Sequence, residues 1–392
     1  MMKVGLTFYL LLGISILFFK SNLAFAYPTT IGLGYNSCIV CHYNPYGNGP
    51  LTDYGRGVSA TAIAAKPLYI ESIDDQTLAN QSGFFGSWVE LPSWFRLSGD
   101  FRSLYLVNQF NADHPVKRWV IMQAEMSAIF KLKKNKLYGV FTYGYIPPPS
   151  SFTGSRRDEV STWISREHYI GYRPIKKLSL MAGFFDPIYG VKTSNHIAFH
   201  RTRTALNQND QSHGIGMSYD FSQFNLGAHV FLGNLFQTQE LRQLGGTLRF
   251  EYRPESELAF GISGLYTSNS FRKRQMTSIH AKLGIGKGSS LLSEIGFIRE
   301  APLSQNAQLG QYIWISPTVK IIRGLYLINA IEYYSQGAFE SDIRRFRLTP
   351  GIQFFPAQRI ELRIEVQADR NFSDSVVNRD SMSFLGQFHL WL

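Results

Sequence analysis

The chain has 392 residues, a formal net charge of +11 and only two cysteines. A charge of this size can indicate nucleic-acid binding, but the sequence contains no basic tail and no phosphate-binding loop, so we attribute the charge to basic turns and an arginine-rich interior. It shows no nucleophile triad pattern either, and hydrolysis is therefore not indicated.

The N-terminus predicts a secretory signal peptide over residues 1–26. Lys3 is followed by an apolar run over residues 4–19, and Ala24-Phe25-Ala26 forms a small-residue cleavage pattern. An uncleaved membrane anchor is the alternative, but the run stops at Lys20. We therefore expect export before folding and a mature chain that begins at Tyr27.

Both cysteines stand in one motif, Cys38-Ile39-Val40-Cys41-His42. A disulfide or a redox dithiol would not need the histidine, and a zinc site would lack a fourth ligand. C-x-x-C-H is instead the pattern of covalent haem attachment, in which Cys38 and Cys41 form thioethers to the vinyl groups and His42 is the proximal ligand of the haem iron. The motif therefore predicts one covalently bound haem c.

The residues after the motif resemble class I cytochrome c, in which a loop containing Gly-Pro-x-Leu and then Gly-Arg lies against the haem. The matching residues are Gly49-Pro50-Leu51 and Gly55-Arg56. The resemblance implies that the Pro50 carbonyl accepts a hydrogen bond from His42 and that Arg56 pairs with a haem propionate, with Pro45 competing for the first role. A turn cluster rich in glycine and proline, without these roles, is the alternative.

The iron's distal ligand is not supplied by this segment. Between Tyr43 and Pro92 the sequence contains no methionine and no second histidine. The iron would then be five-coordinate, weakly ligated, or completed by a residue from elsewhere in the chain.

From Ser93 onward the sequence changes to short stretches of alternating apolar and polar residues, rich in Tyr, Phe and Gly. This period-two pattern is typical of β-strands, and no other apolar run is long enough for a membrane helix. Sixteen strands are predicted, at residues 94–110, 117–131, 137–147, 163–173, 177–187, 212–221, 223–233, 241–253, 256–268, 274–284, 289–300, 309–320, 323–335, 343–355, 358–368 and 380–392.

The connections between these strands alternate between short polar turns, such as 133–136, and longer segments, such as 148–162. Outer-membrane barrels show this asymmetry because their periplasmic turns are tight and their extracellular loops long. The last strand agrees, with Phe384, Phe388, Leu390 and Leu392 on one face, in a pattern that resembles the assembly signal of such barrels. A water-soluble β-sandwich or propeller, the alternative, gives no reason for one-sided loop lengths.

We therefore predict an all-β chain in three parts: the signal peptide, a monohaem cytochrome c-like segment over residues 27–92, and an antiparallel transmembrane outer-membrane β-barrel of about 16 strands over residues 93–392. A haem segment this short gains by sitting inside the periplasmic mouth of the barrel, where strand residues bury the macrocycle.

Strand parity separates residues that face the lumen from residues that face lipid. Five residues with lumen parity are candidates for the distal iron ligand, and for each of them an ordinary lumen residue is the alternative: His389, Met181, His229, His280 and Met276. His389 and Met181 lie closest to the periplasmic end. The same parity predicts that four further methionines face lipid: Met122, Met126, Met217 and Met382.

The longest connection, residues 188–213, carries His196, His200, Arg201 and Arg203. It can fold inward as a constriction or form a metal-contact surface outside, and a solvated loop is the default expectation. The two histidines are four residues apart, a spacing that suits a metal only on a helix.

The whole arrangement resembles the fused monohaem cytochrome–porins of iron-oxidising bacteria. The matching stretch after the haem motif contains Pro50, Leu51, Thr52, Tyr54, Gly55 and Arg56, whereas the insert over residues 43–49 departs from the family. The resemblance implies electron transfer across the outer membrane by an iron:cytochrome oxidoreductase. Its donor would be extracellular Fe(II) or a similar reductant, and its acceptor a periplasmic carrier, either a cytochrome or a copper protein.

Two other functions stay open. The chain can be a diffusion porin whose haem segment is a plug or sensor, or a barrel partner that docks other cytochromes.

Overall fold

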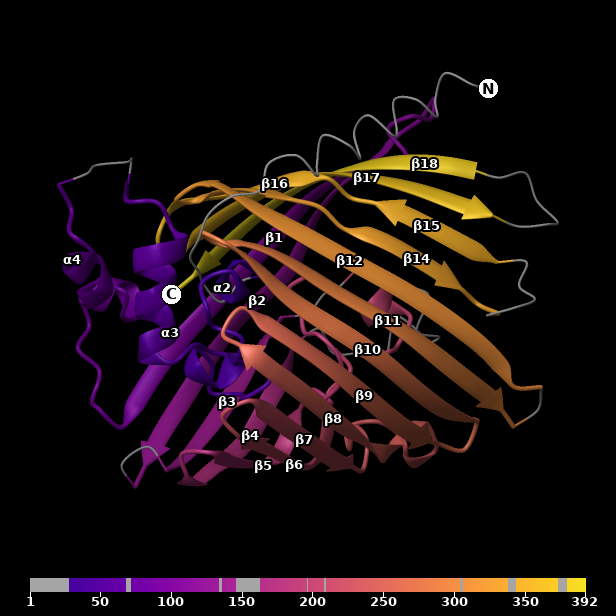
Figure 1. Ribbon diagram of the computed structural model, residues 1–392, viewed down its shortest axis with the longest axis horizontal. Coiled ribbons are helices and arrows are strands. Elements are labelled where there is room, and N and C mark those ends of the chain that lie inside the picture. The colour runs from indigo at the N-terminus through magenta and orange to yellow at the C-terminus, as the bar shows by residue number, and fades with distance from the viewer. Residues whose placement is uncertain are drawn as a thin grey trace.

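A computed structural model describes residues 28–67, 72–133, 136–145, 163–195, 197–207, 209–303, 306–337, 343–372 and 379–392. The predicted signal peptide, the predicted loop 148–162 and His196 lie outside the described residues. One antiparallel sheet dominates the molecule, and it closes into a barrel because β1 (Phe95–Asn108) pairs with both β2 (Val116–Leu132) and β18 (Arg379–Trp391) (Figure 1).

Each remaining strand pairs with its neighbour in sequence except at two interruptions. The strands are β3 (Leu137–Tyr145), β4 (Trp163–Ile175), β5 (Leu178–Phe185), β6 (Ser212–Asp220), β7 (Phe224–Phe231), β8 (Leu244–Glu255), β9 (Leu258–Ser268), β10 (Arg272–Gly286), β11 (Ser289–Pro302), β12 (Gln308–Ile322), β13 (Leu325–Ile328), β14 (Ile331–Ser335), β15 (Arg344–Leu348), β16 (Gly351–Ala357) and β17 (Ile360–Phe372).

The two interruptions divide single strands. Both β13 and β14 pair with β12, and both β15 and β16 pair with β17. The second break falls at Thr349 and Pro350, where proline has no N–H to donate to the ladder. The eighteen segments therefore form sixteen strands, which confirms the predicted strand number and rules out a sandwich.

The connections separate by length onto the two ends of the barrel. One end has turns such as 176–177, 287–288 and 358–359, and the other has longer segments such as 186–211 and 232–243. The predicted alternation is not strict, because 269–271 on the long-loop end has only three residues. In outer-membrane barrels the end with the short turns faces the periplasm. In this chain the first strand begins at that end and the last strand finishes there.

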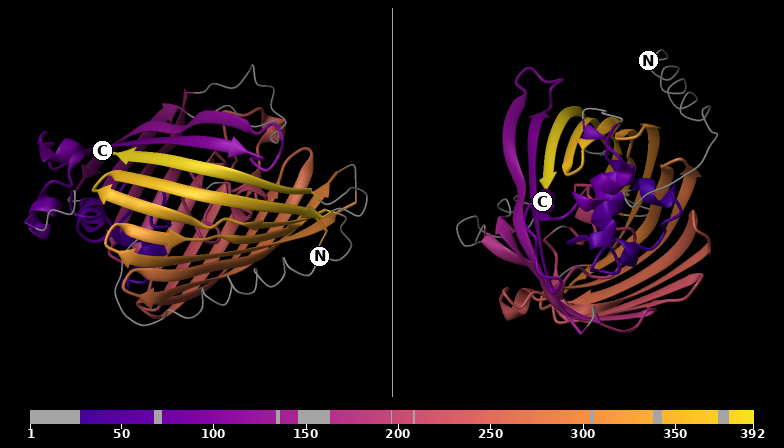
Figure 2. Two further views of the ribbon diagram at one scale, coloured as in Figure 1. Left: turned by 90° about the horizontal axis from the view of Figure 1, so that it is seen from above. Right: turned by 90° about the vertical axis from the view of Figure 1, so that its left-hand side faces the viewer.

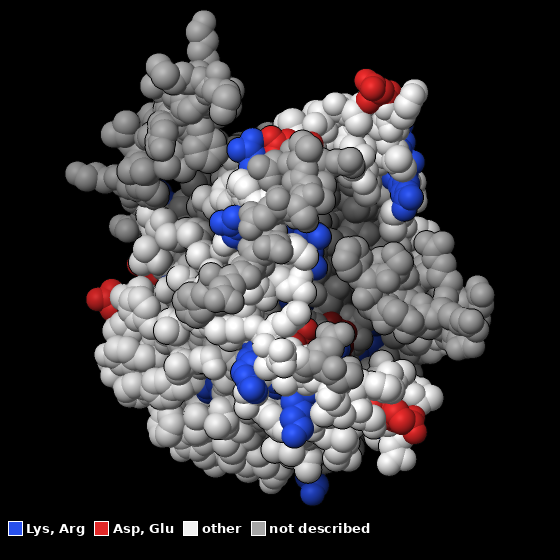
Figure 3. All heavy atoms as spheres, turned by 90° about the vertical axis from the view of Figure 1, so that its right-hand side faces the viewer, with Lys and Arg blue, Asp and Glu red and all other residues white. Residues whose placement is uncertain are grey.

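The wall is apolar outside and polar inside. Seen from the end with the longer connections, most of the described surface carries no Lys, Arg, Asp or Glu (Figure 3). Val230 and Leu248 are 69% and 64% exposed on the outer face, whereas Thr247 and Arg249, on either side of Leu248, are buried. An outer face of this kind matches lipid rather than water. The strand parity predicted from sequence is thereby confirmed for most of the barrel.

One methionine breaks that parity. Met126, Met217 and Met382 lie on the outward side of their strands, as predicted, but Met122 is buried and the prediction for it is wrong. Arg102 pairs with Gln123 and Ser103 with Ile121, so Met122 is the extra residue of a β-bulge. A bulge shifts the alternation by one residue, and sequence parity does not show it.

The N-terminal segment forms short helices that fill the periplasmic mouth (Figure 2). They are α2 (Pro28–Ile31), η1 (Cys38–Val40), α3 (Asp53–Val58), η2 (Ser59–Ile63), α4 (Asp75–Asn80) and η4 (Phe84–Ser87). Helix α2 packs against β10, β11 and β12, with Ile31 in one apolar cluster with Leu292 and Trp314. No helix among the described residues is long and apolar enough to cross a membrane.

Residues 186–211, named here the constriction loop, fold into the lumen and include the short helix α5 (Phe199–Thr202). The default expectation of a solvated loop is wrong. Buried carboxylates of β11 and β14 bind the loop's backbone. Val191 N–H donates to Glu294 at 2.7 Å, and Phe199 N–H donates to Glu332. Apolar side chains of the loop, including Ile188, are buried with it.

Candidate functional site

The cysteine motif forms one tight turn. The backbone N–H groups of Cys41 and His42 both donate to the Cys38 carbonyl, at 3.1 and 2.9 Å. The next residues run back antiparallel, because His42 forms a β-bridge with Leu51 and Thr52 N–H donates to the Cys41 carbonyl at 2.8 Å. The turn brings both sulfurs and the imidazole to the wall of one cavity.

The insert that departs from the family pattern connects this turn to the barrel. Tyr138 Oη donates to the Tyr43 carbonyl at 2.8 Å, and Asn48 Nδ2 donates to Asp186 at 2.9 Å. Gly49 has a φ of +64°, and a Cβ there would meet Glu167 Oε2 at 2.6 Å. Glycine adopts this left-handed backbone without strain, whereas a larger residue would be strained and would also displace the end of the Glu167 side chain.

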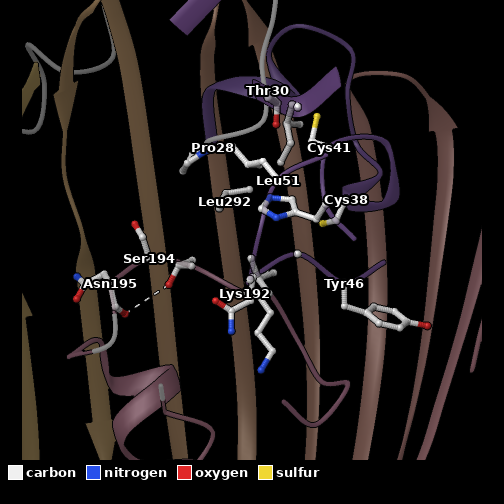
Figure 4. A pocket seen from close by; sticks show the side chains of 18 of the residues that line it. Pro28, Thr30, Cys38, Cys41, Tyr46, Leu51, Lys192, Ser194, Asn195 and Leu292 are labelled. Atoms are coloured by element: carbon white, nitrogen blue, oxygen red, sulfur yellow. Dashed lines mark hydrogen bonds between the residues drawn. The ribbon is translucent and has the colours of Figure 1, made fainter. Parts of the chain in front are cut away.

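The cavity has a volume of about 340 Å³ and lies between the N-terminal segment, the constriction loop and the barrel wall. Figure 4 shows Cys38, Cys41 and Leu51 on one side of it and Lys192, Ser194 and Asn195 on another. Its charged lining is mostly basic. It contains Arg102, Lys192, Arg201, Arg249, Arg253, Lys282 and Arg363 against Asp100, Glu125 and Glu251.

His42 has the environment of a neutral metal ligand. Burial lowers the pKa of its imidazole, and the backbone of Gly49 and Asn48 and the charge of Asp100 offset this only in part. Its Nδ1 is buried with no hydrogen-bond partner among the described residues. A buried polar atom without a partner is costly, and a neutral imidazole is the form that ligates iron. The residues of the motif therefore fit a haem.

Cys41 is buried as well. Burial is the main cause that raises the pKa of its thiol to about 11, and the nearby Cys38 is the second cause. Cys41 itself is therefore not an activated redox thiol, which needs a stabilised thiolate.

Of the two residues that the cytochrome c resemblance adds, neither makes the implied contact in this structure. The Pro50 carbonyl accepts from the Tyr43 backbone at 3.3 Å, and the backbone of Asn48 and Gly49 lies nearer the imidazole. Arg56 donates to the Leu97 carbonyl at 2.6 Å and is not among the described residues that line the cavity. Pro45 does line the cavity. The roles of Pro50 and Arg56 stay predictions.

The five candidates for the distal ligand are all buried, but they lie at different places in the lumen. Among the described residues that line the cavity, His389 is the one candidate present. Its two ring nitrogens lie 3.0 Å from Glu361 and 3.2 Å from Asp100.

The other four candidates have separate surroundings. Met181 packs in an apolar cluster with Tyr43 and Tyr169, and Met276 packs with Tyr189 and Tyr312. His229 stacks on Phe185 with ring centroids 4.4 Å apart. His280 lies 3.1 Å from Glu251.

The constriction loop carries the histidines that suggested an external metal contact. His200 is buried against Trp314, with ring centroids 4.2 Å apart. It therefore does not face outside. Within the described part of the chain, no group of three or more metal-ligating side chains is found.

The cavity also contains residues that the sequence reasoning missed, above all Asp100 and Arg102 on β1, Arg363 on β17 and Lys192 on the constriction loop. The polar alternation of β1 and β17 could have identified the first three as lumen residues. No local signal could have placed Lys192 there, because its position depends on the loop folding inward.

No protein-family model and no curated protein sequence matches this chain. Solved structures do match, at identities that show the fold alone. OmpT of Vibrio cholerae has a TM-score of 0.58 and 11% identity and covers 78% of this chain and 100% of its own. An anion-selective porin from Comamonas acidovorans has a TM-score of 0.57 and 11% identity, covering 76% and 99%. Pseudomonas putida OprB has a TM-score of 0.60 and 9% identity, covering 85% and 100%.

These matches show that the chain has the fold of outer-membrane porins. Together with the apolar outer face, they support a location in the outer membrane.

Proposed function

We propose that this chain is an outer-membrane electron-transfer protein, in which a covalently attached haem lies in the periplasmic mouth of a porin-like barrel. The observation that carries the proposal is the turn that brings Cys38, Cys41 and the buried His42 to the wall of one cavity. A diffusion pore has no use for such a motif.

The chain's own residues would act in four ways. Cys38 and Cys41 hold the group covalently, so that it is not lost to the periplasm. His42 supplies the proximal nitrogen. The barrel wall and the constriction loop line the cavity, and its basic lining favours an anionic group. The haem, when bound, supplies a one-electron redox centre whose potential depends on this burial and charge.

The donor we propose is extracellular Fe(II) or a similar reductant, and the acceptor a periplasmic cytochrome or copper protein. This part rests on the resemblance to the fused cytochrome–porins. An N-terminal segment that packs against β10, β11 and β12 fits it, because such a segment would carry the redox centre into the barrel.

The test uses the full chain, purified in detergent without oxygen. Covalent haem is detected by peroxidase staining of a denaturing gel, and the absorption spectrum is recorded before and after Fe(II). We expect a c-type spectrum that Fe(II) reduces, loss of the stained band in Cys38→Ser with Cys41→Ser, and a stained band with an altered spectrum in His42→Ala. Covalent haem in the double cysteine variant would refute the attachment. A haem that dithionite reduces and Fe(II) does not would refute the donor.

A diffusion porin with a haem-bearing plug is the second candidate, and the fold comparisons favour it, because the matching structures include an anion-selective porin. The basic lining of the cavity agrees with anion passage. Conductance in planar bilayers distinguishes the two functions. Electron transfer predicts a closed barrel, whereas a porin predicts steady anion-selective current and a haem that external reductants do not affect.

A further inference from the structure

The chemistry of a c-type haem fixes which wall of the cavity its propionates face, provided that the proposed function holds. The thioether bonds form at vinyl groups on two adjacent pyrroles, and the propionates stand on the other two, at the opposite edge of the macrocycle. Because Cys38 and Cys41 hold the vinyl edge, the propionates must face the wall away from η1.

The constriction loop forms part of that wall. Lys192, Ser194 and Asn195 all line the cavity, and Figure 4 shows them across it from Cys41. An amine, a hydroxyl and an amide on three neighbouring positions are hydrogen-bond donors suited to carboxylates.

The charge balance of the loop also suits an anion. Lys192 Nζ lies 3.2 Å and Arg201 Nη2 lies 4.0 Å from the same oxygen of Asp186, so Lys192 shares its close carboxylate with Arg201, on which Asp210 and Glu294 also act. Two further charged residues on β4 lie near Asp186 and Lys192. They are Arg166 and Glu167, whose charges are opposite in sign. Burial lowers the pKa of Lys192, and Asp186 offsets this only in part. A second carboxylate would stabilise the charged amine.

Three other basic residues of the cavity, Arg249, Lys282 and Arg363, are placed less well for this role. Arg249 is on the vinyl side, since its guanidinium lies 5.6 Å from the Tyr46 ring, and Gly47, the next residue, packs on Cys38 Sγ. Lys282 lies 2.7 Å from Glu251, which also pairs with Arg249. Arg363 lies 2.7 Å from Glu365 on its own strand.

We propose that Lys192, with Ser194 and Asn195 beside it, binds the haem propionates. The constriction loop is then part of the haem site and holds the edge of the macrocycle opposite the thioethers.

The experiment is a potentiometric titration of the purified full-length protein, followed by haem absorbance at several pH values near neutrality. A positive charge beside a propionate stabilises the reduced haem and keeps the propionate ionised. Lys192→Met should therefore lower the midpoint potential and make it pH-dependent, whereas Lys192→Arg should leave both unchanged. Arg370→Met removes an exposed basic residue that does not line the cavity and should also leave both unchanged.

If Lys192→Met does not fold because Asp186 loses its partner, Lys192→Gln retains a hydrogen-bond donor for Asp186, removes the positive charge and should show the same lowered, pH-dependent potential. An unchanged potential in folded Lys192→Met or Lys192→Gln, or an equal shift in Arg370→Met, overturns this inference and leaves the proposed function standing. A wild-type protein without covalent haem overturns the proposed function, and this inference with it.

Discussion

Arg323 is the strongest single tie between the N-terminal segment and the barrel. It lies in the turn between β12 and β13, where its Nε donates to the Ala64 carbonyl at 2.7 Å and its Nη2 to the Ala60 carbonyl at 3.1 Å. Its Nη1 donates to Asp75 at 2.8 Å. Replacing Arg323 with Met retains the apolar stem and removes every donor.

The loss can be worked out from these contacts. Each hydrogen bond from a charged group to a carbonyl contributes about 1.5–3 kcal/mol. The Asp75 side chain is 58% exposed, so its ion pair contributes only about 0–1 kcal/mol. Allowing for water that replaces part of the bonding, we expect a loss of about 3 kcal/mol of docking free energy, which is about a hundredfold in the opening equilibrium.

Hydrogen exchange measured by mass spectrometry on the detergent-solubilised protein checks this value. Amides of η2 should exchange about a hundredfold faster in Arg323→Met, while the strands β6 to β9 stay protected. Arg370→Met is the matched control, because it breaks an ion pair with Asp380 whose two side chains are each 54% exposed, and it should change nothing. Unchanged exchange in η2, or exchange that rises over the whole barrel, would refute the reasoning.

Three further predictions use the same measurement. Asp53 accepts hydrogen bonds from Arg96 and Lys131. Burial raises the pKa of its carboxyl, but these bonds outweigh burial and hold the pKa below the usual 3.8. The stabilisation is then complete well above pH 3.8 and is lost as the pH falls through the lowered pKa; Asp53→Asn should abolish this pH dependence of exchange in α3, and retention of it would contradict the assignment. Glu294→Gln weakens the acceptor of the Val191 N–H, so the constriction loop should open more easily by about 1 kcal/mol, and equal exchange in both proteins would show that the carboxylate does not hold the loop. Gly49→Ala should undock the segment because of its φ of +64° and the contact with Glu167, whereas Gly57→Ala, with nothing within 4 Å of its added Cβ, should not; equal exchange in the two variants would count against the close fit.

Much of the fold is readable from the sequence because it depends on local patterns. Alternation of apolar and polar residues identifies strands, since successive side chains point to opposite faces, and breaks in alternation mark the turns between them. The sequence predicts each of the two divided strands as a single strand. At the second division, for example, Pro350 interrupts the ladder without disturbing the alternation on either side. The turn of Cys38, Cys41 and His42 is likewise local, because its hydrogen bonds close within five residues.

Only the tertiary structure decided how distant parts of the lumen meet. Strand parity predicts that His389, His229 and His280 point inward. It does not predict their positions along the barrel axis or around the barrel, because these depend on the register of all sixteen strands. The constriction loop folds inward because Val191 finds a buried acceptor at Glu294, more than a hundred residues away. Met122 is displaced by a bulge that exists only against its partner strand. Period-two patterns carry no information about such long-range pairings, and it is these pairings that close the cavity around the cysteine motif.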